Sequence, residues 1–109
     1  MKINFYNHKN ESINISISIS LEDGELKLEG YDCGSNVENL RGMSDEFEYS
    51  LTLDKENTDK LFKKLDISYK TTQQKLETVR DRFSKDKGVF GLDKFCEEND
   101  ITTSYFSWP

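Results

Sequence analysis

Four acidic residues near the middle of the chain are the side chains best suited to chemistry: Asp32, Asp45, Glu46 and Glu48. Hard cations prefer oxygen ligands, so carboxylates that converge at the mouth of a hairpin would form a cation site or a carboxylate-dependent active site. The EF-hand spacing is absent, however, and Glu46 and Glu48 alternate with two aromatic residues, as in a strand with one solvated face. We therefore predict no metal site and no cofactor. A small enzyme that uses Asp32, Asp45 and Glu48 remains an alternative function.

The two cysteines offer a second kind of chemistry, nucleophilic or metal-binding. Cys33 and Cys96 are far apart, the chain has one histidine, His8, and no CxxC motif occurs. Zinc needs about four ligands at close spacing, so a zinc site is excluded. Cys96 follows the helical spacing of Leu92 and Phe95, which predicts a buried and inert thiol. We expect two free thiols rather than a disulfide, and no catalytic cysteine, because nothing nearby would activate Cys33.

The segment "EGYDCG" contains glycines at 30 and 34 but is not a phosphate-binding loop. It lacks the GK[ST] ending and the helix that follows such a loop at once. The glycines favour a tight backbone path or a bulge at the end of a strand.

Composition limits the protein to one domain with an acidic half. The 109 residues suffice for one core and carry a net charge of −6. Residues 22–59 hold twelve acids and three bases, whereas residues 61–109 hold eight acids and nine bases. This balance argues against nucleic-acid binding; on composition alone the acids are expected to serve solubility, and attraction of a basic protein partner is the alternative. No signal peptide and no apolar run of about 18 residues occurs, so we expect no membrane segment and a cytoplasmic location.

Alternating apolar residues predict four strands, at 2–7, 12–21, 25–30 and 46–53. In the second strand isoleucine alternates strictly with serine or asparagine, so we expect it inside the sheet rather than at an exposed edge. Asp23-Gly24 predicts a hairpin turn between the second and third strands. Residues 31–42 are expected to form a loop.

Apolar residues at helical spacing predict three helices, at 55–65, 71–85 and around 91–100. Asp54 is suited to cap the start of the first helix. Gly88, which follows Asp86 and Lys87, is suited to end the second helix. The aromatic tail is either a fifth strand or a segment laid across the core, with Phe106 and Trp108 buried. The order of elements predicts an α+β fold: an antiparallel sheet of four to five strands, with N-terminal hairpins and about three helices on one face.

Three motifs carry a resemblance to a known family. "LEGYDCG", "GMSDEFEYSLTL" and "SYFSW" resemble the EGxDxG loop, the GDSDxEY strand entry and the terminal FSW of a widespread family of small bacterial proteins. Met43 stands where the family pattern has an acid. The matching positions are Glu29, Gly30, Asp32, Gly34, Gly42, Ser44, Asp45, Glu48, Tyr49, Phe106, Ser107 and Trp108.

The family in turn resembles immunity proteins in size, charge and architecture. The resemblance implies a non-enzymatic protein that neutralises a bacterial toxin by binding its basic surface. Two sets of residues are then of interest. The expected partner-binding residues are Asp32, Asp45, Glu46 and Glu48. The residues expected to organise the two loops are Gly30, Asp32, Gly34, Gly42 and Asp45. A self-associating structural or regulatory domain is the remaining alternative.

Overall fold

The computed structural model describes residues 1–9, 14–33, 46–84 and 89–108 of the chain. The described residues form an α+β fold, as predicted, with five strands and three helices. In chain order the elements are β1 (Lys2–Lys9), β2 (Asn14–Glu22), β3 (Glu25–Cys33), β4 (Glu46–Leu53), α2 (Lys55–Lys64), α3 (Thr72–Phe83), α4 (Phe90–Glu98) and β5 (Ser104–Trp108).

The strands form one antiparallel sheet in the order β1-β2-β3-β4-β5, so every strand pairs with the strand that follows it in the sequence. The isoleucine–serine strand β2 is internal, as predicted. The turn between β2 and β3 is the predicted one: Asp23 and Gly24 both have positive φ, 53° and 81°, the conformation of a tight two-residue hairpin turn.

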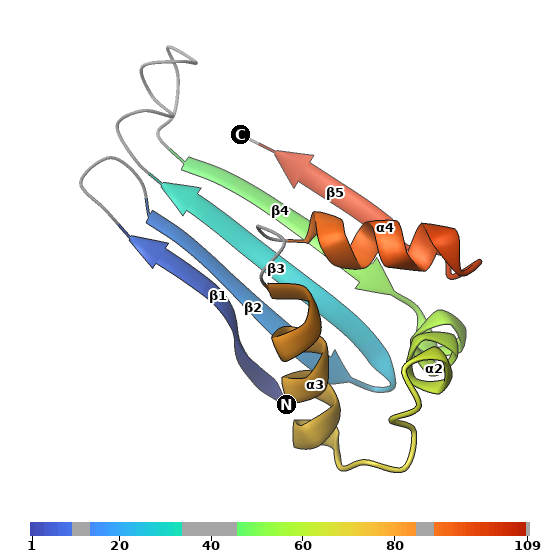
Figure 1. The fold of residues 1–109 in the computed structure, drawn as a ribbon. Coiled ribbons are helices and arrows are strands. Elements are labelled where there is room, and N and C mark those ends of the chain that lie inside the picture. Colours follow the sequence, from blue (N-terminus) through green and yellow to red (C-terminus); the bar gives the residue numbers. More distant parts are fainter. Residues whose placement is uncertain (10–13, 34–45, 85–88, 109) are drawn as a thin grey trace.

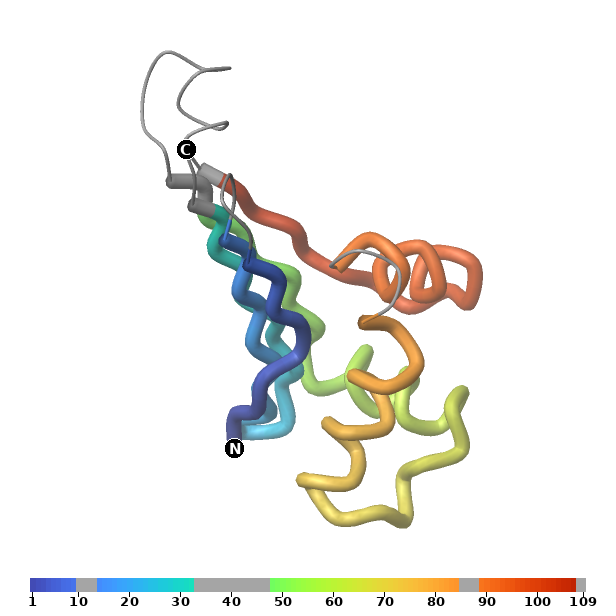
Figure 2. The backbone as a smooth tube through the Cα atoms, turned by 60° about the vertical axis from the view of Figure 1, so that its left-hand side comes forward, coloured from blue at the N-terminus to red at the C-terminus, as the bar shows by residue number. Residues whose placement is uncertain are grey.

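The sheet is covered on one face. Figure 1 shows α3 and α4 in front of the strands, and Figure 2 shows the sheet nearly edge-on with all three helices on the same side. α3 packs on β1 and β2, whereas α2 packs on β3 and β4. The buried core lies between the two layers and includes Ile17, Ile19, Leu26, Leu28, Leu51 and Leu53 from the sheet and Leu61, Phe62, Leu76, Val79, Leu92 and Cys96 from the helices.

The two longer helices begin at side-chain caps that the sequence contains. The Asp54 carboxylate accepts a hydrogen bond from the Asn57 amide, 2.9 Å away, at the start of α2. Thr71 and Gln74 form a reciprocal capping box at the start of α3. α3 ends at Phe83, two residues before the predicted end, and the glycine expected to end it lies outside the described residues.

Two buried polar side chains attach α2 to its neighbours. The Thr58 hydroxyl accepts a hydrogen bond from the Leu26 amide of β3 and donates one to the Leu53 carbonyl of β4, each 3.1 Å long. The Asn57 side-chain oxygen accepts a hydrogen bond of 2.8 Å from the Thr102 amide, ahead of β5. The start of α2 is therefore bonded to the end of β4, which precedes it directly, and to two segments that are distant in the sequence.

Two sequence-based expectations are wrong in part. β3 continues through Cys33, so residues 31–33 form a strand rather than the start of a loop. The tail is a strand, β5, but Phe106 is 63% exposed and is not in the core. The reason is register: Phe106 pairs with Ser50, whose side chain lies on the face of the sheet away from the helices. The Trp108 side chain lies outside the described residues, although its backbone pairs with Glu48.

Candidate functional site

The sheet face opposite the helices, called the open face below, is polar. Because side chains alternate along a strand, every residue that neighbours a core position in β2, β3 or β4 points to the open face. The register aligns these neighbours in rows across the three strands: Ser16–Tyr31–Glu48, Ser18–Glu29–Ser50 and Ser20–Lys27–Thr52. Small hydroxyl side chains thus flank Glu29 and Lys27 of β3 on both sides and Tyr31 on one side, and among the described helices none covers them.

Two adjoining hollows lie on the open face. The first has a volume of about 310 Å³ and is lined by Ser16, Ser18, Lys27, Glu29, Gly30, Tyr31, Glu48, Tyr49 and Ser50. The second, of about 450 Å³, is lined by Lys2, Ser20, Glu22, Glu25, Lys27, Glu29 and Thr52. Lys27 and Glu29 line both, so the two hollows are neighbours. Together they contain four carboxylates and two ammonium groups, which gives this surface an acidic balance.

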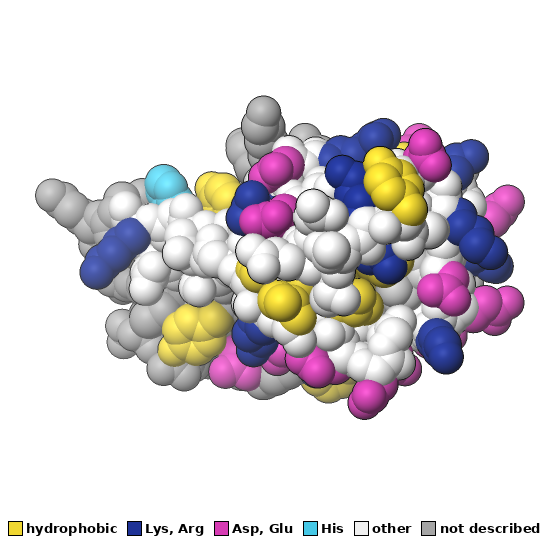
Figure 3. Space-filling model, turned by 90° about the horizontal axis from the view of Figure 1, so that it is seen from below, with side chains coloured by type: hydrophobic (Ala, Val, Ile, Leu, Met, Phe, Trp, Pro, Cys, Tyr) yellow, Lys and Arg dark blue, Asp and Glu magenta, His cyan; other side chains and the backbone are white. Residues whose placement is uncertain are grey.

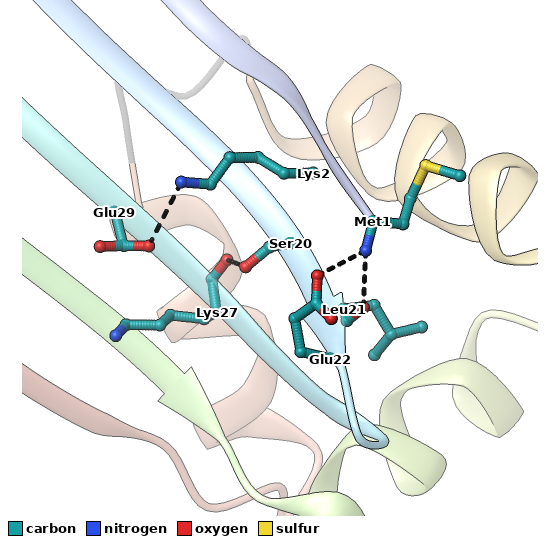
Figure 4. A network of polar contacts seen from close by, with 7 residues as sticks. All are labelled: Met1, Lys2, Ser20, Leu21, Glu22, Lys27 and Glu29. Atoms are coloured by element: carbon teal, nitrogen blue, oxygen red, sulfur yellow. Dashed lines mark hydrogen bonds and ion pairs between the residues drawn. The ribbon is translucent and has the colours of Figure 1, made fainter.

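The ion pairs at one end of the open face are at the surface. Figure 4 shows Lys2 reaching across β2 toward Glu29, with 3.8 Å between the ammonium nitrogen and the carboxylate. It also shows the N-terminal amine of Met1 bound to the Glu22 carboxylate, which lowers the pKa of that carboxyl. Exposed pairs of this kind contribute little to stability, because water screens both charges. Glu29 can therefore exchange its lysine for a cation of a partner at small cost.

A different cluster lies on the helix face of the same strands: Gly30, Asp32 and Tyr49. Gly30 pairs with Tyr49 across the β3–β4 ladder, and the tyrosine ring lies over the glycine. A Cβ atom at position 30 would lie 2.6 Å from the Tyr49 hydroxyl oxygen and closer still to the ring. The ring reaches past Gly30, so that its hydroxyl donates to the Asp32 carboxylate over 3.4 Å. Gly30 is thus required for space, as a glycine beneath a cross-strand aromatic ring.

Burial determines the protonation of this cluster. Partial burial raises the pKa of the Asp32 carboxyl above its ordinary value, and the hydrogen bond from Tyr49 opposes that shift. Burial, followed by the charge of Asp32, raises the pKa of the Tyr49 phenol far above its ordinary value. The phenol therefore stays protonated and acts as a donor to Asp32, not as a base.

The structure separates the predicted site residues. Asp32 lies on the helix face, where it accepts a hydrogen bond from Tyr49, whereas Glu48 lies on the open face and pairs with Tyr31, so the sheet lies between the two carboxylates. Glu46 is placed by its backbone alone, which pairs with Cys33. Three further predicted residues, Gly34, Gly42 and Asp45, lie outside the described residues.

The loop-organising role predicted for Gly30 and Asp32 remains a prediction. Both residues lie within β3, ahead of the segment from residue 34 to residue 45, which is outside the described residues. Their described contacts bind β3 to β4 through Tyr49.

The remaining chemistry-bearing groups provide no second site among the described residues. Cys96 is a fully buried free thiol, as the sequence predicted, and burial, followed by the charge of Asp93, raises its pKa to about 12. A thiol with such a pKa is not a nucleophile near neutral pH. Across the described ranges, no three His, Cys, Asp or Glu side chains come together as a metal site requires.

The lower end of the molecule carries mixed charge on its surface. Figure 3, which views the molecule from below, shows Lys and Arg side chains interspersed with Asp and Glu. This mixture differs from the continuous basic surface that nucleic acid needs. None of the described helices has the length and apolar character required to cross a membrane.

Comparison of the chain with family models, with curated proteins and with solved structures gives no significant match. The functional argument therefore rests on the geometry of the chain itself.

Sequence reasoning singled out Glu48 but missed its neighbours on the open face, Glu29 and Tyr31 among them. The polar residues of each alternating strand could have revealed this surface. In β2 the serines indicate the solvent-facing side of the strand as clearly as the isoleucines indicate the core side. The polar half of each predicted strand directs Glu29 and Glu48 away from the core, whereas Asp32 was expected in a loop and had no predicted face.

Proposed function

We propose that the protein is a non-enzymatic binding protein of the immunity type, which uses its open face to bind a basic toxin domain. The observation that carries the proposal is the acidic, hydroxyl-rich surface formed by β2, β3 and β4, which no described helix covers. An immunity protein acts where the toxin would harm its producer, and the proposal places this one in the cytoplasm.

The chemistry of the open face suits basic side chains. Glu29 and Glu48 stand on adjacent strands, two residues apart in register, with Tyr31 beside Glu48. Carboxylates accept the hydrogen bonds of arginine and lysine, and a tyrosine ring attracts a cation to its face. The serine hydroxyls of β2 and β4 are short, so a long side chain of the partner can lie along them. Complementary charge of this kind increases the rate of encounter and fixes the register of the complex.

The competing enzyme hypothesis has less support. It requires Asp32, Asp45 and Glu48 to act together, whereas Asp32 and Glu48 lie on opposite faces of the sheet. Asp32 is also engaged by the Tyr49 hydroxyl. No specific observation in the described residues favours this alternative over binding.

The test is charge reversal on the open face. The Glu29→Lys/Glu48→Lys variant should bind the basic toxin domain encoded beside the gene much more weakly than the parent does, and should fail to protect cells that express the toxin. Binding of the parent should also weaken as salt is added, because the attraction is electrostatic. Calorimetry measures the affinity, and co-expression measures the protection.

A matched control distinguishes the effect of the charges on the open face from the effect of the net charge of the protein. Glu97 and Glu98 are exposed on α4, on the other side of the sheet, and their double replacement by lysine makes the same change in net charge. This control should bind and protect as the parent does. An equal loss in both variants, or no binding of a neighbour-encoded basic domain by the parent, would contradict the proposal.

A further inference from the structure

The outer edge of β5 is a second candidate interaction site, at the margin of the sheet and outside the hollows over β2, β3 and β4. β5 is the last strand of the sheet and pairs with β4 along one edge only. Among the described residues no strand pairs with its other edge. The backbone groups directed outward from such an edge are a template for a further strand, and proteins usually protect them.

The other edge of the sheet, β1, is protected in the usual ways. Lys2 and Lys9 place a positive charge at each end of the strand, and the register shifts between Asn4 and Tyr6, where Phe5 is the extra residue of a bulge. Charges and bulges both oppose the addition of a strand. β5 has neither: its sequence, SYFSW, contains no charged residue, and its pairing with β4 is regular.

Exposed aromatic side chains gather at this unprotected edge. Among the described residues, five large hydrophobic side chains are exposed, and three of them lie here: Phe90 at 64%, Tyr105 at 44% and Phe106 at 63%. Phe90 at the start of α4 lies against Tyr105, with 6.1 Å between ring centroids, and Tyr105 stacks on Tyr49. Phe106 points to the opposite face of the same strand. Exposed aromatic side chains therefore flank the unpaired edge on both faces of the sheet, where a second chain that pairs with β5 would cover them.

We propose that β5 pairs with β5 of a second copy of this chain, so that two sheets join into one. Full antiparallel pairing of a five-residue strand with itself is centred on its middle residue, Phe106. Phe106 then stands opposite its own copy, Tyr105 stands opposite Ser107, and no like charges meet. The pairing is isologous, as a twofold dimer requires.

The symmetry has consequences for the rest of the molecule. The twofold axis of such a pair is perpendicular to the sheet, so the helices of both copies lie on one face and both open faces lie on the other. Phe90 of each copy then lies beside the junction. The proposal does not depend on the proposed toxin partner, because it rests on the outer backbone edge of β5; Phe106 lies on the same side of the sheet as the open face, next to Ser50.

The available area indicates a weak dimer. An aromatic side chain presents roughly 150–250 Å², so three side chains exposed by about half give on the order of 300 Å² per copy. With the paired backbone added, the interface stays at or below the roughly 1,200 Å² lower limit of standard stable complexes. We therefore expect a reversible, concentration-dependent dimer.

Light scattering on the full chain tests the proposal. The measured mass should rise from 12.7 kDa toward twice that value as the concentration rises through the micromolar and millimolar range. Phe106→Lys places a charge opposite its own copy and should remain monomeric at the same concentrations. Tyr69→Lys is the matched control, because Tyr69 is another exposed aromatic residue, 80% exposed, in the segment between α2 and α3. It should dimerise as the parent does.

Amide hydrogen exchange on the unmodified chain provides a second readout, which does not require any variant to fold. Protection should increase with concentration in residues 104–108 and not in β1. A parent that stays monomeric throughout, or a dimer that Phe106→Lys leaves intact, would overturn the proposal. If Phe106→Lys does not fold, Phe90→Lys replaces it, with the same expected loss of dimer.

Discussion

Replacing Gly30 by alanine should destabilise the protein strongly, although alanine is ordinarily acceptable in a strand. The added Cβ would overlap the Tyr49 ring, so the ring must leave its position over β3. Overpacking of this kind costs about 1–3 kcal/mol, and loss of the Tyr49–Asp32 hydrogen bond adds about 0.5–1.5 kcal/mol. We expect the free energy of unfolding to fall by about 2–4 kcal/mol, and the melting temperature by on the order of 10 °C.

Urea unfolding measures this loss, and a double-mutant cycle with Tyr49→Leu identifies its cause. Leucine lacks the distal ring atoms that Gly30 accommodates, so Gly30→Ala should cost less than about 0.5 kcal/mol in that background. Gly24→Ala is the control: its cost arises from the positive φ of 81° and should be the same with tyrosine or leucine at position 49. If Gly30→Ala costs the same in both backgrounds, Tyr49 is not the reason for the glycine, and the reasoning fails.

Three further predictions concern stability and reactivity. Thr58→Val should cost about 1–3 kcal/mol in urea unfolding, because it leaves two buried backbone groups unbonded, whereas Thr58→Ser should retain most of the stability. Asp54→Ala should be less stable than the parent at neutral pH. The hydrogen bond from the Asn57 amide lowers the pKa of the Asp54 carboxyl in the folded state. The stability that the Asp54 carboxylate contributes is therefore fully present above the pKa of the unfolded chain and is lost as the pH falls through the pKa of the folded protein. In thermal melts from neutral to acid pH, the melting temperatures of the parent and of Asp54→Ala should converge. In a Cys33→Ser variant, the Cys96 thiol should react with a thiol reagent only on unfolding, and rapid reaction of the native protein would contradict its burial.

Local patterns were sufficient to predict most of the elements. The isoleucine–serine alternation predicted an internal strand, and Asp23-Gly24 predicted the turn that follows it. The caps at Asp54 and Thr71 lie at the starts of predicted helices. In each case the interaction joins residues a few positions apart, so the sequence contains both partners within one short window.

The sequence did not predict which carboxylates share a surface. Asp32 and Glu48 were grouped as possible members of one site, yet they lie on opposite faces of the sheet. The grouping failed because the face that a residue occupies depends on strand register, and a shift of one residue reverses it. The length of β3 mattered as well: Asp32 was expected in a loop, where no face is defined, and it lies in a strand.

The sequence by itself thus determined the types of most elements, the hairpin turn between β2 and β3 and the acidic character of the chain. Only the tertiary structure decided that Gly30 makes room for Tyr49, that Phe106 is exposed, and that Glu29 and Glu48 share an uncovered surface. The physical reason is the range of the interactions. Caps, turns and alternation are set within a few residues, whereas the pairing of β3 with β4 and of β4 with β5 brings together side chains whose proximity no local pattern encodes.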